Sequence, residues 1–352
     1  MLSGLAVLPK KTALTEYSYA TSRDNQRAFL HGLDRKLINT GLATADQAIF
    51  DLDFHAVMHW GTDPVLEKHY VPTRSQRARS VLTFFAQDAG THNLVYANAD
   101  LSKATQAREV TAFADHWKNV SGHDPHMLVM DQKVTTHAVL GELNDRGIKF
   151  LTLRMRSPAL AKTINALTPA GFKTTNLDRT GKHTKPKVHE SAAVKLTNYP
   201  ATARQLIVTG LGREAPTVII TNDHDTTTKH LTERYARRMT IEQRLAETIR
   251  AFHADALSST VNLNVDLDIM LAVLAQALHA ALRQRLPGYA TVTPDTLQRR
   301  FLDTPGQIIL NGDTITVHLQ RRAYTPVLRQ ADLPTDTTVP WWGNRTLRYQ
   351  FT

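Results

Sequence analysis

The order of periodic segments along the chain constrains its fold more than any other feature. Apolar residues alternate with a period of two in three early segments, and segments with helical and strand-like spacing then follow in turn. This succession predicts an α/β fold in which helices flank a mixed sheet. The strand-like segments are 48–60, 80–87, 93–99, 126–130 and 149–153, and the helical ones are 22–40, 105–120 and 135–145.

The remaining sequence suggests an insertion and a C-terminal extension. Residues 157–215 contain many turn residues and short β-like runs, which favour an inserted β-rich subdomain. A strand at 217–221 then precedes a long helix at 228–253 and an apolar helix at 266–286. We therefore expect four parts. They are an N-terminal helical segment (1–47), an α/β domain (48–156 and 216–286), the β-rich insertion (157–215) and the extension (287–352).

Composition narrows the class of protein. The longest apolar stretch, within Leu267–Leu282, spans about 16 residues, which is short for a membrane span and predicts a buried helix. The chain has no cysteine, which excludes disulfides and thiolate metal sites and fits a reducing compartment. Its net charge of +10 would attract a polyanion such as nucleic acid. We expect a cytoplasmic protein that does not enter a membrane.

Two aspartates stand out because they lie in apolar strands. Asp53 interrupts the segment at 48–60, and Asp131 directly follows the segment at 126–130. A buried carboxylate is costly unless a cation or hydrogen bonds compensate its charge. Strand ends are also where sites assemble in α/β sheets. Asp51 is the alternative to Asp53, since it lies two residues away on the same strand face.

A glutamate on the long helix supplies a third carboxylate. At 100° per residue, Tyr235 and Arg238 lie within about 40° of the Glu242 direction, so the three share one stripe. A solvated charged face is the alternative reading, but Ile241 and Leu245 place Glu242 beside the buried face. Three carboxylates suit hard divalent cations, and two such ions suit phosphodiester chemistry.

These residues carry a family resemblance. Between about residues 50 and 285 the chain resembles the DDE transposases of bacterial insertion sequences. The matching stretches are LDFHAVMHWG around Asp53, LVMDQK around Asp131 and YARRMTIEQRL around Glu242.

The last stretch is similar to a Tyr–x2–Arg–x3–Glu–x6–Lys helix motif of one large transposase group. Tyr235, Arg238 and Glu242 match it, whereas Ile249 stands where the motif has lysine. Arg250 or Arg244 would then supply the basic contact.

The resemblance implies a ribonuclease H-like catalytic domain with a β-rich insertion between the second Asp and the Glu. It implies that Asp53, Asp131 and Glu242 are catalytic and hold Mg²⁺ or Mn²⁺ for DNA cleavage at element ends and strand transfer. It also implies that Tyr235 and Arg238 contact DNA near the cleaved phosphate. Since only about 50 residues precede Asp53, we expect the family's N-terminal DNA-binding domain to be missing or truncated.

Further basic residues are expected to bind double-stranded DNA, both transposon ends and target. A basic run at 68–79 lies beside the first aspartate strand, and Lys133 follows the second aspartate. We expect a homodimer on DNA, associated with the nucleoid. An inactive DNA-binding remnant of a transposase is the main alternative, and a nuclease without strand transfer is another. The expected contacts from these two regions are Lys68, Arg74, Arg77, Arg79 and Lys133.

Overall fold

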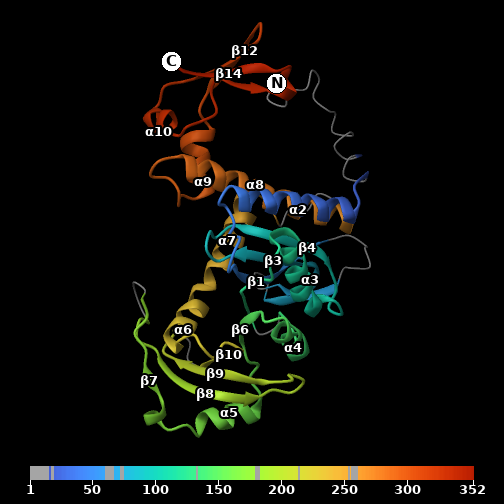
Figure 1. Cartoon of the computed structure of the whole chain (residues 1–352), viewed down its shortest axis with the longest axis vertical. Coiled ribbons are helices and arrows are strands. Elements are labelled where there is room, and N and C mark those ends of the chain that lie inside the picture. The colour runs from blue at the N-terminus through green and yellow to red at the C-terminus, as the bar shows by residue number, and fades with distance from the viewer. Residues whose placement is uncertain are drawn as a thin grey trace.

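The computed structural model has an elongated shape with a large sheet, a layer of long helices and a small C-terminal sheet (Figure 1). It describes residues 20–59, 67–71, 75–131, 134–178, 183–212, 215–252 and 261–352, with Glu16 and Ala254. The α-helices named in these ranges are α2 (Arg23–Asn39), α3 (Glu109–Ser121), α4 (His137–Asp145), α5 (Pro158–Asn165), α6 (Thr228–Arg237), α7 (Met239–Phe252), α8 (Asn262–Arg285), α9 (Pro294–Leu297) and α10 (Thr325–Gln330).

The large sheet confirms the expected α/β class with a mixed sheet. It has ten strands in the order β2-β3-β1-β5-β6-β10-β9-β8-β7, with β4 paired to β3. Strands β1 and β3 are antiparallel, whereas β5 and β6 run parallel to β1. The strands are β1 (Ile49–Met58), β2 (Glu67–Val71), β3 (Gln76–Asp88), β4 (Leu94–Leu101), β5 (Met127–Met130), β6 (Lys149–Leu153), β7 (Lys173–Thr174), β8 (Lys187–Lys195), β9 (Thr202–Thr209) and β10 (Thr217–Thr221).

Helices cover both faces of the central strands. Phe50 and Leu52 of β1 are fully buried in a cluster with Trp117 of α3 and Leu140 of α4. The opposite face of β3 and β4 packs against α7 and α8 through a second cluster. Side chains alternate along a strand, and Phe50, Leu52 and Phe54 all point into the first cluster. Asp51 and Asp53, which lie between them in β1, therefore face the α6–α7 side.

The region at 157–215 continues the large sheet. Strands β8 and β9 pair with each other, and β9 pairs with β10, which in turn pairs antiparallel with β6. Helix α5 packs Leu160 and Ile164 against Ile207 and Val218. The short β-like runs in this part of the sequence therefore extend an existing sheet edge.

The prediction of one long helix at 228–253 is wrong in one respect, because the helix is interrupted. Helix α6 ends at Arg237, α7 begins at Met239, and Arg238 lies between them. The backbone N–H of Arg238 donates to the carbonyl of Tyr235 at 3.1 Å, and that of Ile241 donates to the carbonyl of Arg238 at 3.0 Å. These three-residue spacings tighten the helix locally to a 3₁₀ turn.

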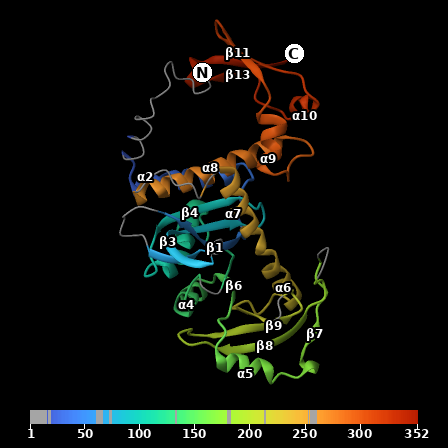
Figure 2. The same cartoon turned by 180° about the vertical axis from the view of Figure 1, so that it is seen from behind.

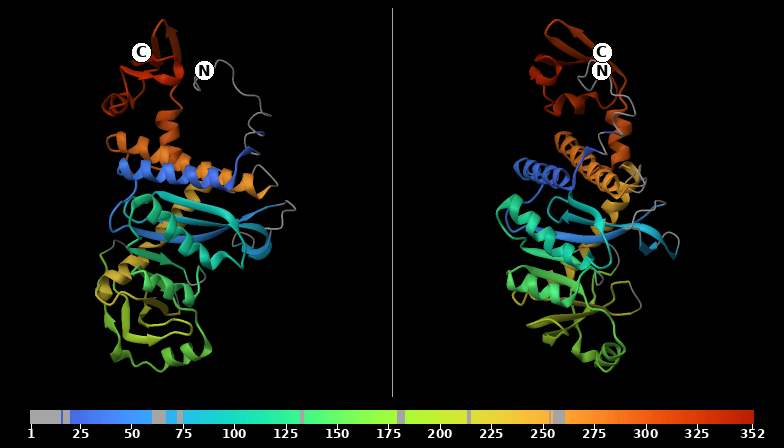
Figure 3. Two further views of the ribbon diagram at one scale, coloured as in Figure 1. Left: turned by 45° about the vertical axis from the view of Figure 1, so that its right-hand side comes forward. Right: turned by 90° about the vertical axis from the view of Figure 1, so that its right-hand side faces the viewer.

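Helix α8 begins four residues before the predicted start at Asp266. Within the described ranges it is a helix long and apolar enough to cross a membrane by length and composition. Val265, Ile269 and Val273 are nevertheless fully buried against α7 and the sheet. As Figure 3 shows, α8 lies beside α2 over the same part of the sheet.

The C-terminal part builds a second, smaller sheet beyond α9, seen from behind in Figure 2. Its core brings together Leu297, Phe301 and Leu328. The strand order is β11-β12-β14-β13. The strands are β11 (Gly306–Asn311), β12 (Thr314–Leu319), β13 (Thr337–Val339) and β14 (Arg345–Phe351).

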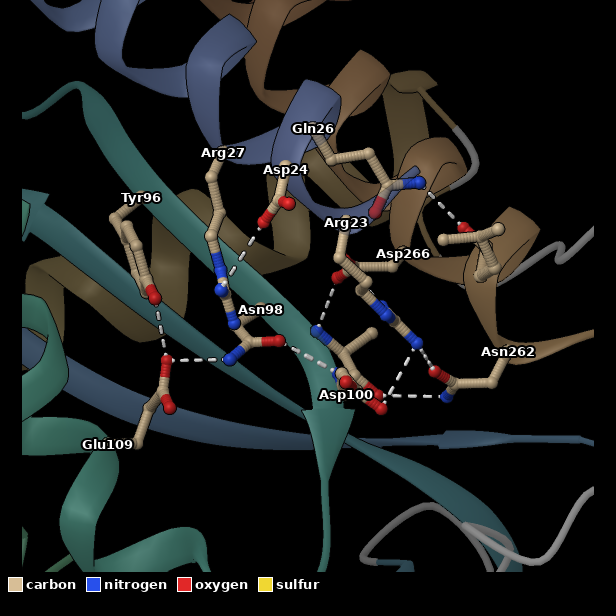
Figure 4. A network of polar contacts seen from close by, with 12 residues as sticks. Arg23, Asp24, Gln26, Arg27, Tyr96, Asn98, Asp100, Glu109, Asn262 and Asp266 are labelled. Atoms are coloured by element: carbon tan, nitrogen blue, oxygen red, sulfur yellow. Dashed lines mark hydrogen bonds and ion pairs between the residues drawn. The ribbon is translucent and has the colours of Figure 1, made fainter. Parts of the chain in front are cut away.

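A buried polar network fastens α2 to the rest of the chain (Figure 4). Arg23 of α2 donates to the Asp266 carboxylate of α8 at 2.8 Å and lies 3.0 Å from Asp100. The other Asp266 oxygen accepts from the backbone N–H of Ala99 at 2.7 Å. Burial raises the pKa of Asp266, while Ala99 and Arg23 act in the opposite direction. This carboxylate therefore depends on Arg23 for compensation.

Replacing Arg23 with Ala should lower the free energy of unfolding by about 3 kcal/mol, because it leaves a buried carboxylate without its cation. Urea denaturation of the purified chain measures this. Arg27→Ala is the matched control, since Arg27 and Asp24 are 72% and 95% exposed and 4.0 Å apart. It should change stability by less than about 0.5 kcal/mol. Equal losses in the two variants would contradict the anchoring role.

Candidate functional site

Two aspartates on β1 face the junction between α6 and α7. The side chain of Asp51 is only 2% exposed and that of Asp53 is 20% exposed. Their strand neighbours Phe50 and Leu52 point the other way, into the hydrophobic core. The alternation that buries these apolar residues therefore also forces both carboxylates toward the helices.

Asp131 comes next to Asp53 through the pairing of parallel strands. In the register of β1 and β5, Leu52 is opposite Met130. Asp53 follows Leu52 in β1, and Asp131 directly follows the last residue of β5. The Asp131 charge contributes to raising the pKa of Asp53. The two aspartates, far apart in sequence, thus lie close together at one place on the sheet.

Arginines of the helix pair with both β1 aspartates. Arg234 lies 2.7 Å from Asp51, and Arg238 lies 3.0 Å from Asp53. Two residues along a strand and four along a helix both advance about 6 to 7 Å. The helix and the strand can therefore form two successive ion pairs, Arg234–Asp51 and Arg238–Asp53. We call these two pairs the arginine–aspartate ladder.

Glu242 completes a group of three carboxylates around Arg238. One oxygen of Glu242 is 3.5 Å from the Arg238 guanidinium, and its side chain is 55% exposed. Burial alone would lower the pKa of Arg238, but the charges of Asp53, Tyr235, Asp131 and Glu242 together raise it. Two of the carboxylates selected from the sequence, Asp53 and Glu242, therefore contact this guanidinium, and the third, Asp131, acts on it electrostatically.

The charge of Asp53 is unfavourable in this environment. Burial is the largest cause, and the nearby carboxylates of Glu242 and Asp131 add to it. Arg238 and the backbone N–H of Phe54 oppose them, but the pKa of Asp53 still rises to about 6. A further cation beside Asp53 would relieve this cost.

The chemistry of the donor set fits a divalent metal ion, although the arrangement holds an arginine at its centre. Oxygen ligands from Asp53, Asp131 and Glu242 are those that Mg²⁺ and Mn²⁺ prefer. Among the described residues, however, no group of three or more His, Asp or Glu side chains is spaced to hold a metal ion. The cation that compensates these carboxylates is Arg238.

The residues expected to contact DNA lie on the β2–β3 hairpin, on helices α6 and α7, or outside the described part of the chain. On the β2–β3 hairpin, Lys68 is opposite Arg79 and the exposed Tyr70 is opposite Arg77, so all four side chains lie on one exposed face. On the helices, Tyr235 is half-buried and Arg250 is exposed. Arg74, Lys133 and the side chain of Arg244 lie outside the described residues.

Arg234 is a site residue that was not expected from the sequence. Asp51 was expected only as an alternative to Asp53, yet in the structure each aspartate has its own arginine. The sequence feature that could have predicted these pairs is the spacing of the residues. The two aspartates are two residues apart on a strand and the two arginines four residues apart on a helix, and these separations span similar distances. A hollow of about 690 Å³ opens beside this first pair and is lined also by Gln47, Asp88, His92 and Arg237.

Comparison with other proteins adds no assignment. No protein-family model matches the chain. No curated protein matches it significantly.

Asp53→Asn should stabilise the metal-free chain at pH 8 by about 2 to 3 kcal/mol, at 1.36 kcal/mol per pKa unit. Folded Asp53 holds its proton up to about pH 6 and the unfolded residue only to about 3.8. Folding stability therefore falls as pH rises through this window, and the cost is complete above about pH 6. Urea denaturation in a chelating buffer from pH 4 to 8 measures the difference.

The stabilisation should vanish toward pH 4, where wild-type Asp53 is itself protonated. Asp46→Asn, which changes an exposed carboxylate, serves as the control and should have little effect at any pH. A stabilisation by Asp53→Asn that is independent of pH would contradict the proposed charge cost.

Proposed function

We propose that the chain is a DDE-type DNA transposase that uses divalent metal ions to cleave DNA and transfer strands. The observation that carries the proposal is the gathering of Asp53, Asp131 and Glu242, from two strands and a helix, around one guanidinium. Carboxylates that repel one another are kept together at a cost. A site for cations and a phosphate is the use that explains this cost.

The sheet supports the proposal. Its central order is β4-β3-β1-β5-β6, with an antiparallel β1–β3–β4 part and with β5 and β6 parallel to β1. This order is compatible with a ribonuclease H-like domain, in which carboxylates on two adjacent central strands meet a third from a helix. Strands β7 to β9, between the second Asp and the Glu, supply the β-rich part that the resemblance implies.

The proposed reaction divides the roles among these residues. Asp53, Asp131 and Glu242 would hold Mg²⁺ or Mn²⁺, which supplies stabilisation of the attacking and leaving oxygens. Arg238 and Tyr235 would orient the DNA phosphate. Hydrolysis adds water across a phosphodiester and leaves a 3′-hydroxyl. In strand transfer this hydroxyl forms a new ester with target DNA while a bond of the target breaks, so no oxidant or reductant is needed.

The hairpin offers a place for the DNA backbone. Lys68, Arg77 and Arg79 present three positive charges on one face, beside the exposed ring of Tyr70. Phosphates bind such surfaces through their charge without reading base sequence. We propose double-stranded DNA as the partner, a homodimer on that DNA, and a cytoplasmic location at the nucleoid.

An inactive DNA-binding remnant of a transposase is the second candidate. The central position of Arg238 favours it, because a guanidinium already neutralises the carboxylates that a metal would need. Both candidates share the hairpin surface. They differ in whether cleavage occurs when Mg²⁺ or Mn²⁺ is added.

Glu242→Gln should abolish metal-dependent cleavage of DNA while leaving DNA binding nearly unchanged. The substitution keeps the shape of the side chain but removes the charge that helps to hold a cation. Nicking of supercoiled plasmid in Mn²⁺ measures cleavage, and a mobility-shift assay measures binding. Glu247→Gln, on the same helix, is the control and should cleave normally.

A wild-type chain that binds DNA but never cleaves it would favour the remnant. Cleavage by Glu242→Gln at the wild-type rate would remove α7 from the site. Pre-cut ends with a target duplex then separate a transposase from a nuclease, because a nuclease joins nothing.

The hairpin surface should bind DNA in a salt-dependent way. Replacing Lys68, Arg77 and Arg79 together with Gln should weaken binding and reduce the dependence of log K on log salt concentration by about 0.9 per lost phosphate contact. Fluorescence anisotropy with a mixed-sequence duplex at several salt concentrations measures both. The matched control removes Arg27, Arg35 and Lys36, three exposed charges of α2. Equal effects of the two triple variants would show that only net charge matters.

A further inference from the structure

We infer that Arg238 is an exchangeable counter-cation, which holds the three carboxylates in the free protein and leaves them when a DNA phosphate arrives, so that DNA binding and metal binding promote each other. The inference rests on the proposed function. It adds a mode of regulation to the same site.

Arg238 occupies the place that a metal ion shared by these carboxylates would take. Its side chain is 7% exposed, and its guanidinium lies 3.0 Å from Asp53 and 3.5 Å from Glu242. Asp131 also acts on it electrostatically. The guanidinium therefore sits where a cation shared by these carboxylates would sit, and the two compete for the same oxygens.

The hydrogen-bond donors of the Arg238 guanidinium are incompletely satisfied. Its Nε is buried and has no hydrogen-bond partner. A buried donor without a partner costs roughly 1–3 kcal/mol. The carboxylates thus neutralise Arg238 without using all of its donors, so a second anion would bind it favourably.

A phosphate would supply the acceptors that the Arg238 guanidinium lacks. Guanidinium forms two parallel, charge-assisted hydrogen bonds with phosphate oxygens. When Arg238 turns to a phosphate, Asp53 and Glu242 lose their cation and become strong ligands for a divalent ion. The 3₁₀ turn between α6 and α7 places Arg238 at the point where the helix is already interrupted.

The effects of DNA on metal affinity and of metal on DNA affinity must be equal, because linkage between two binding sites is reciprocal. If DNA raises metal affinity by removing a competitor, the metal must raise DNA affinity by the same factor. Coupling of this kind typically amounts to roughly 5- to 150-fold. The free chain would bind metal weakly and would gain its catalytic charge balance only on DNA.

The ladder provides a matched control. Arg234 pairs with Asp51 one step earlier, by the same type of contact at 2.7 Å. Arg234→Gln removes an equal charge from the same helix surface. If Asp53 belongs to the metal site and Asp51 does not, only substitution of Arg238 should release metal ligands.

The experiment measures Mn²⁺ binding to the full chain by electron paramagnetic resonance of free Mn²⁺. Each variant is measured with and without a mixed-sequence duplex, and the binding of Mn²⁺ to the duplex alone is subtracted. Arg238→Gln should bind Mn²⁺ roughly tenfold more tightly than wild type without DNA. DNA should tighten Mn²⁺ binding to wild type by a similar factor but have little effect on Arg238→Gln.

Arg238→Lys keeps the test decisive if Arg238→Gln folds poorly, because it retains the charge with fewer donors. It should give a smaller gain. Asp53→Asn combined with Arg238→Gln should lose the gain, because the released ligand is gone. Mn²⁺ should also raise the Tm of Arg238→Gln more than that of wild type, since a ligand of the folded state stabilises it.

Equal Mn²⁺ affinities in wild type and Arg238→Gln would overturn the inference, even if cleavage is metal-dependent. A gain in Arg234→Gln instead would assign the exchange to Asp51 and overturn the role of Arg238. No Mn²⁺ binding by any variant, with or without DNA, would overturn the metal site itself and the proposed function with it.

Discussion

The ion pair between Asp53 and Arg238 is the constraint on which the site depends. A carboxylate on a strand packed between two helical layers has little access to water, and its pKa rises to about 6 despite the guanidinium 3.0 Å away. Removing the guanidinium would leave this buried carboxylate without the cation that opposes its burial cost. The position of β1 against α6 and α7 is therefore tied to the balance of charge between them.

The strands and helices around the Asp53–Arg238 pair bring the other charged residues of the site next to it. The alternation of β1 that buries Phe50 and Leu52 on one face puts Asp51 and Asp53 on the other, and the advance of the helix supplies one arginine to each. The parallel register with β5 then adds Asp131, and the next helical turn adds Glu242. Three carboxylates therefore gather where β1, the end of β5 and α7 converge.

Much of this could be predicted from local sequence, and the remainder depended on contacts between distant residues. The strand at 149–153 and the aspartates Asp53 and Asp131 could be predicted from periodicity, because a charged residue within or directly after an apolar strand can be recognised in the sequence itself. The break at Arg238 did not, since nothing in the helical spacing marks it. The pairing of Arg234 with Asp51, 183 residues apart, needs the packing of helix on sheet. The extension of the sheet through β10 and β9 likewise required strand pairing that no local pattern encodes.

The choice of arginine at the centre of the site has its own logic. Lysine would neutralise one carboxylate as a compact point charge, whereas guanidinium carries several donors in a plane and can contact Asp53 and Glu242 at once. The same plane fits the oxygens of a phosphate. In the proposed exchange, the guanidinium would turn from Asp53 and Glu242 to a phosphate, and a divalent ion would then compensate the two carboxylates. Arg238 also lies in the turn between α6 and α7, where the regular four-residue pattern of backbone hydrogen bonds is already broken.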